Sequence, residues 1–299
     1  MSVIRLLNQE GLQFLSDIPD DSVDLILTDP PYITSRDSGM DKWVEHVAKQ
    51  DASDSEDIMK DEDWDSYKTH EEWHQFFRKG KVHIRYWAKK LVKYRADFLK
   101  YGSIYGKKYA VKTNYGDWDS EFTVEQLGLF IKHFHRILKQ GGTCIVFFDL
   151  WKITNLKGML EEEKFKQIRL VEWIKTNPQP INSSVNYLTN CREIALLGIK
   201  KSKPTFNSKY DKGIYYHPLQ GGKDRFHPTQ KSLPLFEELI NKHSNEGDVV
   251  LDCFAGSATT AIAAINTKRS FIGCEMDEEY YKKSTLRISA AIEKQSRDD

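Results

Sequence analysis

The chain has 299 residues, which is enough for one large domain or two, and its 44 basic and 44 acidic residues leave no formal net charge. This balance excludes a uniformly basic protein that would bind a polyanion through its overall charge. The four cysteines are widely spread without a C-x-x-C pair, so the sequence predicts neither a disulfide framework nor a metal site. Since the N-terminus lacks a signal-peptide pattern and no apolar run has transmembrane length, we expect a soluble cytoplasmic protein without a membrane partner.

Apolar runs and amphipathic stretches alternate along most of the chain, which predicts an α/β fold with a doubly wound, mostly parallel sheet. The expected strands are 3–7, 23–27, 143–148, 170–174, 194–198, 249–251 and 270–274. The expected helices are 11–18, 123–138, one that ends near 163, 233–243, one that begins at 261, and 278–293.

Two stretches, 35–116 and 177–226, interrupt this alternation. The first is strongly acidic over 45–72 and strongly basic over 78–112. Its basic half interleaves lysines and arginines with aromatic residues, a pattern typical of surfaces that bind nucleic acids. The alternative is an amphipathic helix whose solvated basic face packs on its own acidic neighbour. The lysines that we expect to contact a nucleic acid are Lys89, Lys90 and Lys93.

The first candidate site is the tetrapeptide Asp29-Pro30-Pro31-Tyr32, after the expected strand 23–27. Asp29 offers only acceptor oxygens. The prolines cannot donate a backbone N–H and fix their own φ, so the carbonyls around them point outward in a fixed direction. Tyr32 supplies a flat face for stacking. Together these groups suit an exocyclic amino group on a planar ring, and the alternative is a turn that merely ends a strand.

The second candidate site is the small-residue loop 252–260, between strand 249–251 and a helix. Such a loop lets the backbone approach a ligand closely, and the helix N-terminus favours negative groups. Glu275 ends the next strand, 19 positions after Gly256, where a carboxylate can accept hydrogen bonds from ribose hydroxyls. The loop is not G-x-G-x-x-G, because its third small residue is Ala258, so a nucleoside without a phosphate is favoured over a dinucleotide. A structural glycine turn is the alternative.

These motifs resemble those of a known family. The segments 29–32 and 252–257 are similar to the two signature motifs of the S-adenosylmethionine-dependent DNA amino-methyltransferases. Lys-Thr-Asn-Pro at 175–178 and His-Pro-Thr-Gln-Lys at 227–231 lie between them as in that family. The catalytic motif comes first and the cofactor loop last, which resembles the circularly permuted order of the β group. The resemblance covers about residues 1–36 and 115–295.

The resemblance implies a Rossmann-like methyltransferase sheet and S-adenosylmethionine as the cofactor. It places Glu275 at the cofactor's ribose, and Thr229 and Lys231 at its carboxylate end. An acidic residue after the first strand often faces the adenine in this family, and Glu10 is the best match here. The full set of implied cofactor-binding residues is Glu10, Asp252, Phe254, Gly256, Ser257, Glu275, Thr229 and Lys231.

The implied reaction is methyl transfer to the amino group of a base in double-stranded DNA. Asp29 and the Pro30 carbonyl would accept the amino hydrogens, with Pro31 in the same rigid loop, and Tyr32 would stack on a base extruded from the duplex. Asp at the first motif position resembles the adenine-N6 enzymes, whereas cytosine-N4 enzymes more often carry Ser. Cytosine-N4 methylation is therefore one alternative. An inactive methyltransferase-like DNA-binding module is another, suggested by Ala258 where the family usually has glycine.

The resemblance also predicts how the chain is divided. Residues 1–36 and 115–295 form the catalytic domain, 37–114 form a charged helical insertion, and 177–226 form a target-recognition segment within the catalytic domain. A cognate restriction endonuclease and a homodimer are further partners that the family suggests. Besides the three lysines of the insertion, the implied substrate contacts are Trp173, Lys175 and Asn177.

Overall fold

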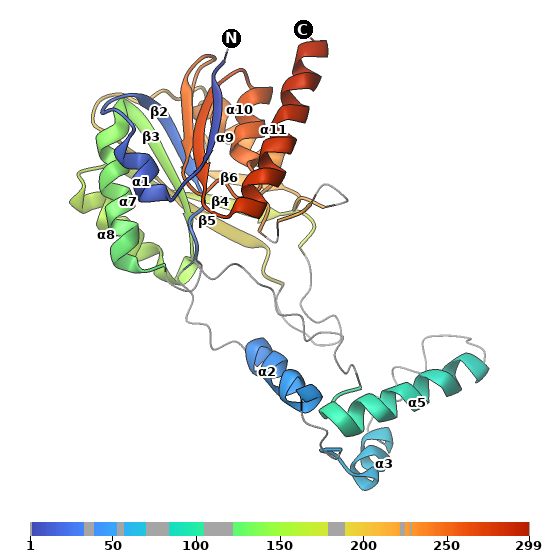
Figure 1. Ribbon diagram of the computed structural model, residues 1–299. Helices are drawn as coiled ribbons and strands as arrows, with labels where there is room; N and C mark the ends of the chain where they lie inside the picture. The colour runs from blue at the N-terminus through green and yellow to red at the C-terminus, as the bar shows by residue number, and fades with distance from the viewer. Residues whose placement is uncertain are drawn as a thin grey trace. The chain divides into compact units, whose positions relative to one another are not determined.

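The structure is a computed structural model of the chain (Figure 1). It describes residues 2–32, 39–52, 57–69, 84–104, 122–178, 189–221, 225–227 and 229–298, without the side chains of 39–44, 68–69, 84–90 and 298. The chain forms two compact units, which are described separately. The larger unit is Met1–Thr34 with Tyr115–Asp299, and the smaller is Ser35–Asn114.

An eight-stranded sheet forms the centre of the larger unit, in the order β1-β8-β7-β2-β3-β5-β4-β6. Among the described strands β5 alone runs antiparallel to its neighbours, so the predicted mostly parallel sheet is confirmed. The strands are β1 (Ile4–Asn8), β2 (Val23–Thr28), β3 (Leu138–Phe148), β4 (Lys166–Lys175), β5 (Arg192–Ile199), β6 (Ile214–His217), β7 (Val249–Asp252) and β8 (Ser270–Glu275).

Helices cover both faces of this sheet, which confirms the doubly wound arrangement (Figure 1). The helices α1 (Gly11–Ser16), α7 (Val124–Ile137) and α8 (Ile153–Glu162) pack on one face, and the short helix η2 (Leu150–Lys152) precedes α8. The helices α9 (Leu233–His243) and α10 (Thr259–Asn266) pack on the other face, beside α11 (Glu278–Asp298). Because the central strands are buried on both faces, they read in the sequence as continuous apolar runs.

Several element boundaries differ from the sequence expectation, and one strand was not expected. β3 begins at Leu138, directly after α7, and includes the glycines that we expected between the helix and the strand. Gly141 has φ 84°, and a Cβ there would lie 2.5 Å from the Lys203 carbonyl oxygen, so glycine is required for this close approach. β6 was not expected. It pairs in parallel with β4 and makes part of the stretch 177–226 an edge of the sheet.

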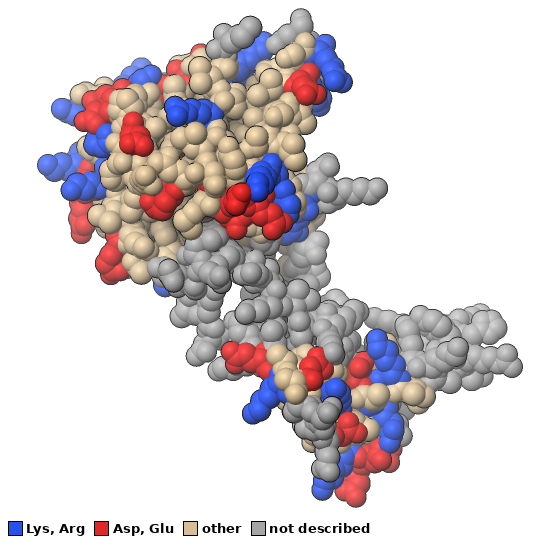
Figure 2. All heavy atoms as spheres, viewed as in Figure 1, with Lys and Arg blue, Asp and Glu red and all other residues tan. Residues whose placement is uncertain are grey.

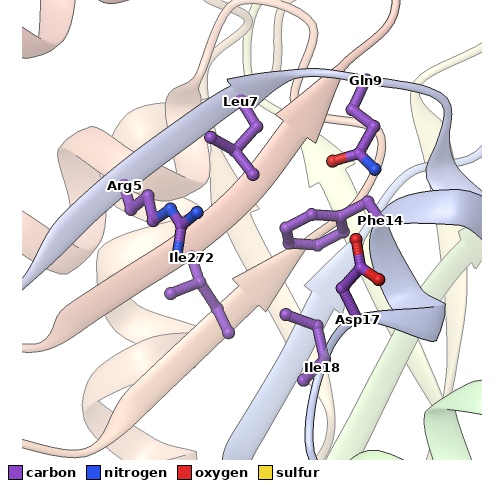
Figure 3. A pocket seen from close by; sticks show the side chains of 7 residues that line it. All are labelled: Arg5, Leu7, Gln9, Phe14, Asp17, Ile18 and Ile272. Atoms are coloured by element: carbon purple, nitrogen blue, oxygen red, sulfur yellow. The ribbon is translucent and has the colours of Figure 1, made fainter.

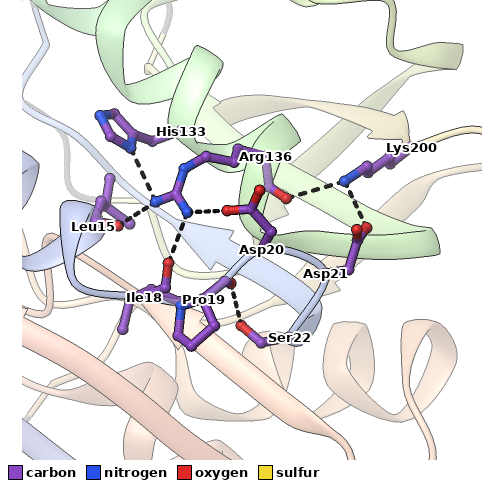
Figure 4. A network of polar contacts seen from close by, with 9 residues as sticks. All are labelled: Leu15, Ile18, Pro19, Asp20, Asp21, Ser22, His133, Arg136 and Lys200. Carbon is purple, nitrogen blue, oxygen red and sulfur yellow. Dashed lines mark hydrogen bonds and ion pairs between the residues drawn. The ribbon is translucent and has the colours of Figure 1, made fainter.

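A network around Arg136 of α7 fixes the segment that leads into β2 (Figure 4). The Arg136 guanidinium donates to the carbonyl oxygens of Leu15 and Ile18, at 2.7 and 2.8 Å, and forms an ion pair with Asp20. Lys200 joins the same network by pairing with Asp21 at 2.8 Å. The turn between α1 and β2 is therefore held to α7, which fixes where the carboxyl end of β2 emerges.

The smaller unit contains α2 (Gly39–Ala52), α3 (Asp61–Thr69) and α5 (Ile84–Tyr101), within the predicted insertion 37–114. Its small core is formed by Trp64, Phe98, Leu99 and Ile104. Tyr94, one of the tyrosines that alternate with the basic residues, packs beside this core. Tyr101 is 5% exposed and donates to Asp51 at 2.7 Å. Arg95 of α5 forms an ion pair with Asp61 of α3, so the basic helix does pack on its acidic neighbours.

Within the described residues, no helix combines the length and the apolar character that crossing a membrane requires.

Candidate active site

The two candidate sites meet at one edge of the sheet. β2 and β7 are parallel neighbours, with Leu25 opposite Val250 and Ile26 opposite Leu251, so Asp29 and the loop after Asp252 leave the sheet side by side. After β7 the chain continues through α10 to β8, whereas after β2 its next strand is β3 on the other side. The point between β2 and β7 is therefore the topological switch point, where doubly wound sheets bind their ligands. The methyltransferase sheet that the family resemblance implies places these two strands side by side, and the pairing of β2 with β7 confirms this.

Asp252 joins the two loops. Its side chain is 4% exposed, and its oxygens accept hydrogen bonds from the Thr28 and Thr260 hydroxyls, both at 2.6 Å. The Phe254 N–H donates to Oδ1 as well, at 3.0 Å. Burial raises the pKa of Asp252, and the two hydroxyl bonds oppose that shift. Because these protein donors surround the carboxylate, its observed contacts hold the two loops together. A direct contact between Asp252 and a cofactor stays a prediction.

The two oxygens of Asp29 have different surroundings. Oδ2 forms an ion pair with the Lys231 ammonium at 2.9 Å. Oδ1 is buried and has no hydrogen-bond partner among the residues that the structure describes. Burial raises the pKa of Asp29 to about 6, although the adjacent Lys231 lowers it. A buried acceptor without a donor is costly in a folded protein, so Oδ1 is an acceptor that remains available to a donor from outside the described residues.

Tyr32 has a similar unpartnered group. Its hydroxyl is buried and makes no hydrogen bond within the described part of the chain. Its ring meets the Phe148 ring edge-on, with 6.2 Å between the centroids. The Lys231 ammonium lies 5.4 Å from the Tyr32 ring centroid. Burial, and then the charge of Asp29, raise the pKa of the phenol, which stays neutral at physiological pH. The aromatic ring thus lies at the same edge as the free oxygen of Asp29.

A chain of alternating charges continues from Asp29 along the sheet edge. Lys231 is 8% exposed and pairs with Glu193 of β5 at 2.5 Å as well as with Asp29. Glu193 also pairs with Lys175 of β4 at 2.7 Å. Lys231 and Lys175 were predicted from motifs, as a cofactor contact and a substrate contact, and both contacts stay predictions. Glu193 was not predicted, because it lies in an ordinary strand sequence without a motif.

The glycine loop is organised by Glu275, at the carboxyl end of β8. This side chain is 7% exposed and accepts from the Gly256 N–H at 2.7 Å and from the Asp277 N–H at 2.9 Å. Burial raises its pKa, against the effect of these two bonds. Ser257 lies within hydrogen-bond distance of Thr259, at 3.1 Å, and Phe254 packs on Phe130 with 4.7 Å between centroids. The predicted cofactor loop and its carboxylate are thus in direct contact.

The segment before α9 lies over this loop. A Cβ on Gly256, whose φ is 49°, would lie 3.5 Å from the His227 ring, which also packs on Tyr280. The Thr229 N–H donates to His227 Nδ1 at 3.3 Å. Burial, and then the charge of Lys231, lower the pKa of His227 to about 4, so the ring is neutral at physiological pH. The segment that carries Thr229 and Lys231 therefore spans the distance between the glycine loop and Asp29.

Three other predicted residues have roles in the fold. Glu10 is the N-cap of α1, and its two oxygens accept from the Leu12 and Gln13 N–H groups, each at 2.9 Å. Trp173 was expected to contact substrate, but it is 0% exposed in the core and donates from Nε1 to the His217 carbonyl at 2.8 Å. Asn177 accepts from the Leu219 N–H at 2.6 Å. We correct the expectation for Trp173, because its buried ring offers no surface to DNA.

The three lysines of the insertion all lie on α5. Lys93 is exposed, and the side chains of Lys89 and Lys90 lie outside the described part. A separate cavity of about 90 Å³ lies between α1 and the strands β1 and β8 (Figure 3). It is lined in part by Arg5, Leu7 and Ile272, which stand in the middle of their strands, so it is distinct from the switch point.

The fold is a doubly wound α/β sheet. At its switch point the glycine loop after β7, of the kind expected to bind a nucleoside, lies beside the Asp29 carboxylate and the Tyr32 ring. The DNA methylase family N6_N4_Mtase matches residues 86–286, more than half of the chain, and the chain belongs to this family.

Curated relatives and solved structures agree with this assignment. The chain is 27% identical over 303 residues to the Type II methyltransferase M2.DpnII of Streptococcus pneumoniae, covering 96% of this chain and 90% of that protein. It is 32% identical over 198 residues to M2.LlaDCHI of Lactococcus lactis subsp. cremoris, covering 60% of this chain and 73% of that protein.

Among solved structures, an M1.HpyAVI–SAM complex has TM-score 0.56 and 22% identity, covering 95% of this chain and 100% of that chain. The cytosine-N4-specific PvuII DNA methyltransferase has TM-score 0.60 and 16% identity, covering 98% of this chain and 92% of that chain. These two structures support the fold.

Proposed function

We propose that the protein is a site-specific DNA methyltransferase that moves the methyl group of S-adenosylmethionine to the N6 amino group of an adenine extruded from double-stranded DNA. The observation that carries the proposal is the unpartnered, buried Oδ1 of Asp29 beside the Tyr32 ring, at the switch point of the sheet. An amino group on a planar ring supplies both the donor that Oδ1 lacks and a face for Tyr32 to stack on.

The residues of the glycine loop fit this cofactor. Gly256 leaves the space that a Cβ would occupy beside His227, and each Glu275 oxygen uses one lone pair on a backbone N–H and keeps another for a ribose hydroxyl. Phe254, Gly256, Ser257 and Glu275 are the residues that we propose hold it. When bound, S-adenosylmethionine supplies a methyl group already activated by its sulfonium centre.

The protein's own contribution is to orient the amino nitrogen. Its lone pair is delocalised into the base, so it is a poor nucleophile. Hydrogen bonds to Asp29 Oδ1 and to the Pro30 carbonyl favour a pyramidal nitrogen whose lone pair is free. Asp29, with a pKa of about 6, is ionised at neutral pH and can take up the proton that this nitrogen loses. Alignment and preorganised acceptors therefore supply most of the acceleration.

Adenine is the preferred base because the first motif residue is Asp29, as in the adenine-N6 enzymes that the chain resembles. Cytosine-N4 is the second candidate, since both bases present an amino group to the same acceptors and the chain shares its fold with a cytosine-N4-specific enzyme. Mass spectrometry of nucleosides from treated DNA decides between them. We expect N6-methyladenine, and N4-methylcytosine alone would overturn the choice of base.

DNA contacts are proposed for residues 177–226 and for the exposed Lys93 of the insertion. On the face of the larger unit seen in Figure 2, basic and acidic side chains are interspersed among broad uncharged areas. This face therefore does not favour DNA binding through a uniformly basic surface, and we expect local contacts to position the DNA. The relatives named Type II methyltransferases support a cognate restriction endonuclease as a partner of the system. A homodimer stays a prediction.

The Asp29→Ala variant tests the function directly. We expect it to abolish methyl transfer while S-adenosylmethionine still binds, as measured by calorimetry. Retained turnover would show that Asp29 does not hold the base. An inactive DNA-binding module, the third reading, requires that the wild-type chain fails to bind the cofactor in the same experiment.

A further inference from the structure

Lys231 is placed between two carboxylates that come from different strands. Its ammonium lies 2.9 Å from Asp29 Oδ2 and 2.5 Å from Glu193 Oε2. The side chain is almost fully buried, with the rings of Tyr32 and Phe147 within 5.5 Å of the ammonium. A buried ammonium with two carboxylates stays charged, and the pKa of Lys231 is raised because the two carboxylates outweigh the effect of burial.

This pairing separates the two oxygens of Asp29. The ammonium holds Oδ2, and Oδ1 is left buried with no partner in the part of the chain that the structure describes. Among the described residues, Asp252 on β7 is a further charged group that acts on Asp29 from the sheet, and Tyr32 interacts with Asp29 from the same loop. Glu193 in turn is held by Lys175 of β4. The four groups Asp29, Lys231, Glu193 and Lys175 therefore form a chain of alternating sign.

We propose that Lys231 and Glu193 are positioning residues for Asp29, in which the ammonium fixes Oδ2 so that Oδ1 faces the amino group of the base, and Glu193 anchors the ammonium. This inference rests on the proposed function for the identity of the donor. It assigns Lys231 to the catalytic carboxylate, whereas its motif predicted a contact with the carboxylate end of the cofactor. It also gives a function to Glu193, which no motif marks.

The proposal makes opposite predictions for the two partners. In Lys231→Met, Asp29 loses its adjacent cation while it stays buried, so its pKa rises by about 1 unit or more. In Glu193→Gln, the amide keeps a hydrogen bond to Lys231 but removes the negative charge near Asp29, so the pKa of Asp29 falls. If Lys231 and Glu193 only maintained the fold, their substitutions would not shift the pKa of Asp29 in opposite directions.

The test is a pH titration of full-length protein labelled with ¹³C at the aspartate carboxyl carbons, with the Asp29 signal assigned by its loss in Asp29→Asn. The same variants are assayed for kcat against pH and for S-adenosylmethionine affinity by calorimetry. We expect the Asp29 midpoint and the acid limb of kcat to move up in Lys231→Met and down in Glu193→Gln. Cofactor affinity should change by less than about threefold.

Lys242→Met is the matched control. Lys242 is also held by two carboxylates, Asp211 and Glu238, each at 2.6 Å, but it lies at the other end of α9. Its variant should lose stability without moving either midpoint. An Asp29 midpoint that stays in place in Lys231→Met, or a loss of cofactor affinity there with kcat unchanged, would overturn the inference. If the wild-type protein methylates no DNA, the proposed function is wrong. The carboxyl titration still tests whether Lys231 and Glu193 control the pKa of Asp29.

Discussion

The Thr28 hydroxyl donates a 2.6 Å hydrogen bond to Asp252 Oδ1, joining two residues that are 224 positions apart in the sequence. Thr28 is the last residue of β2, directly before Asp29, and Asp252 is the last residue of β7, directly before the glycine loop. Both side chains are almost completely buried. A single bond thus connects the strand end that carries the proposed acceptor for the base to the strand end that carries the proposed cofactor loop.

Thr28→Val should break this connection at nearly constant volume. Asp252 would lose one of its donors while remaining buried, and hydrogen bonds to charged groups contribute about 1.5–3 kcal/mol. We expect the free energy of unfolding, measured by urea denaturation, to fall by about 2 kcal/mol. We also expect methyl transfer to fall, because the two loops are no longer held in register. Unchanged stability would show that the bond does not brace the site.

Thr143→Val is the control for that substitution. Thr143 lies on the neighbouring strand β3, and its buried hydroxyl has no hydrogen-bond partner among the described residues. Replacing an unsatisfied hydroxyl by a methyl group removes a desolvation cost, so this variant should be as stable as the wild type or more stable. The contrast between the two threonines then isolates the bond to Asp252 from the change of side chain.

The pH dependence of kcat should follow Asp29. Burial raises the pKa of this carboxyl to about 6. The ionised form is the stronger acceptor and is the form that can take up the proton that the amino nitrogen loses. Turnover at saturating substrates should therefore decline as pH falls through about 6, with a slope of 1 on a logarithmic plot. His227, with a pKa of about 4, does not titrate in this range. A kcat that is constant from about pH 5 to 7 would contradict an ionised Asp29 as the acceptor.

The sequence predicted what depends on neighbouring residues. The tetrapeptide 29–32 and the loop 252–257 are local motifs at strand ends, and the apolar runs 23–27 and 249–251 predicted the strands that carry them. The ion pair between Lys231 and Glu193 could not be predicted, because it depends on where β5 lies in the sheet. β6 was missed because four residues in a polar stretch give little periodicity. Trp173 was assigned by its nearness to a motif, whereas its apolar strand is the better signal of a core residue.

Glu275→Gln and Glu10→Gln should separate a cofactor carboxylate from a helix cap. Glu275 contacts the Gly256 N–H, so we expect its substitution to weaken S-adenosylmethionine binding by about tenfold or more in calorimetry. Glu10 caps α1, so its substitution should cost about 1 kcal/mol of stability and leave the affinity almost unchanged. A large loss of affinity in Glu10→Gln would instead support the adenine contact that the family resemblance implies.

Lys93→Glu should reveal whether the insertion contacts DNA. Lys93 is exposed on α5, while Tyr94 and Phe98 of the same helix pack at the small core, so reversing its charge leaves the unit folded. If Lys93 neutralises a phosphate, the slope of log affinity against log salt should decrease in magnitude by about 1. Lys282→Glu, on the exposed face of α11, serves as the control. An identical slope in wild type and Lys93→Glu would favour the insertion as a self-contained helical unit with a solvated basic face.

Ala258→Gly tests whether the alanine in the cofactor loop impairs the site. Ala258 has φ 58° and ψ 33°, a left-handed conformation that costs an alanine about 1–2 kcal/mol, so the position does require the backbone that favours glycine. Its side chain, however, is 0% exposed and packs in the core at the start of α10.

Relief of the backbone strain in Ala258→Gly is therefore opposed by the lost burial of one methyl group, worth about 0.8 kcal/mol, and by the extra entropy of the unfolded chain with glycine. We expect stability to change by less than about 1 kcal/mol and cofactor affinity by less than about threefold. A large gain of affinity and of methyl transfer in Ala258→Gly would show that the methyl group crowds the cofactor. That result would support the alternative that the wild-type chain is an inactive DNA-binding module.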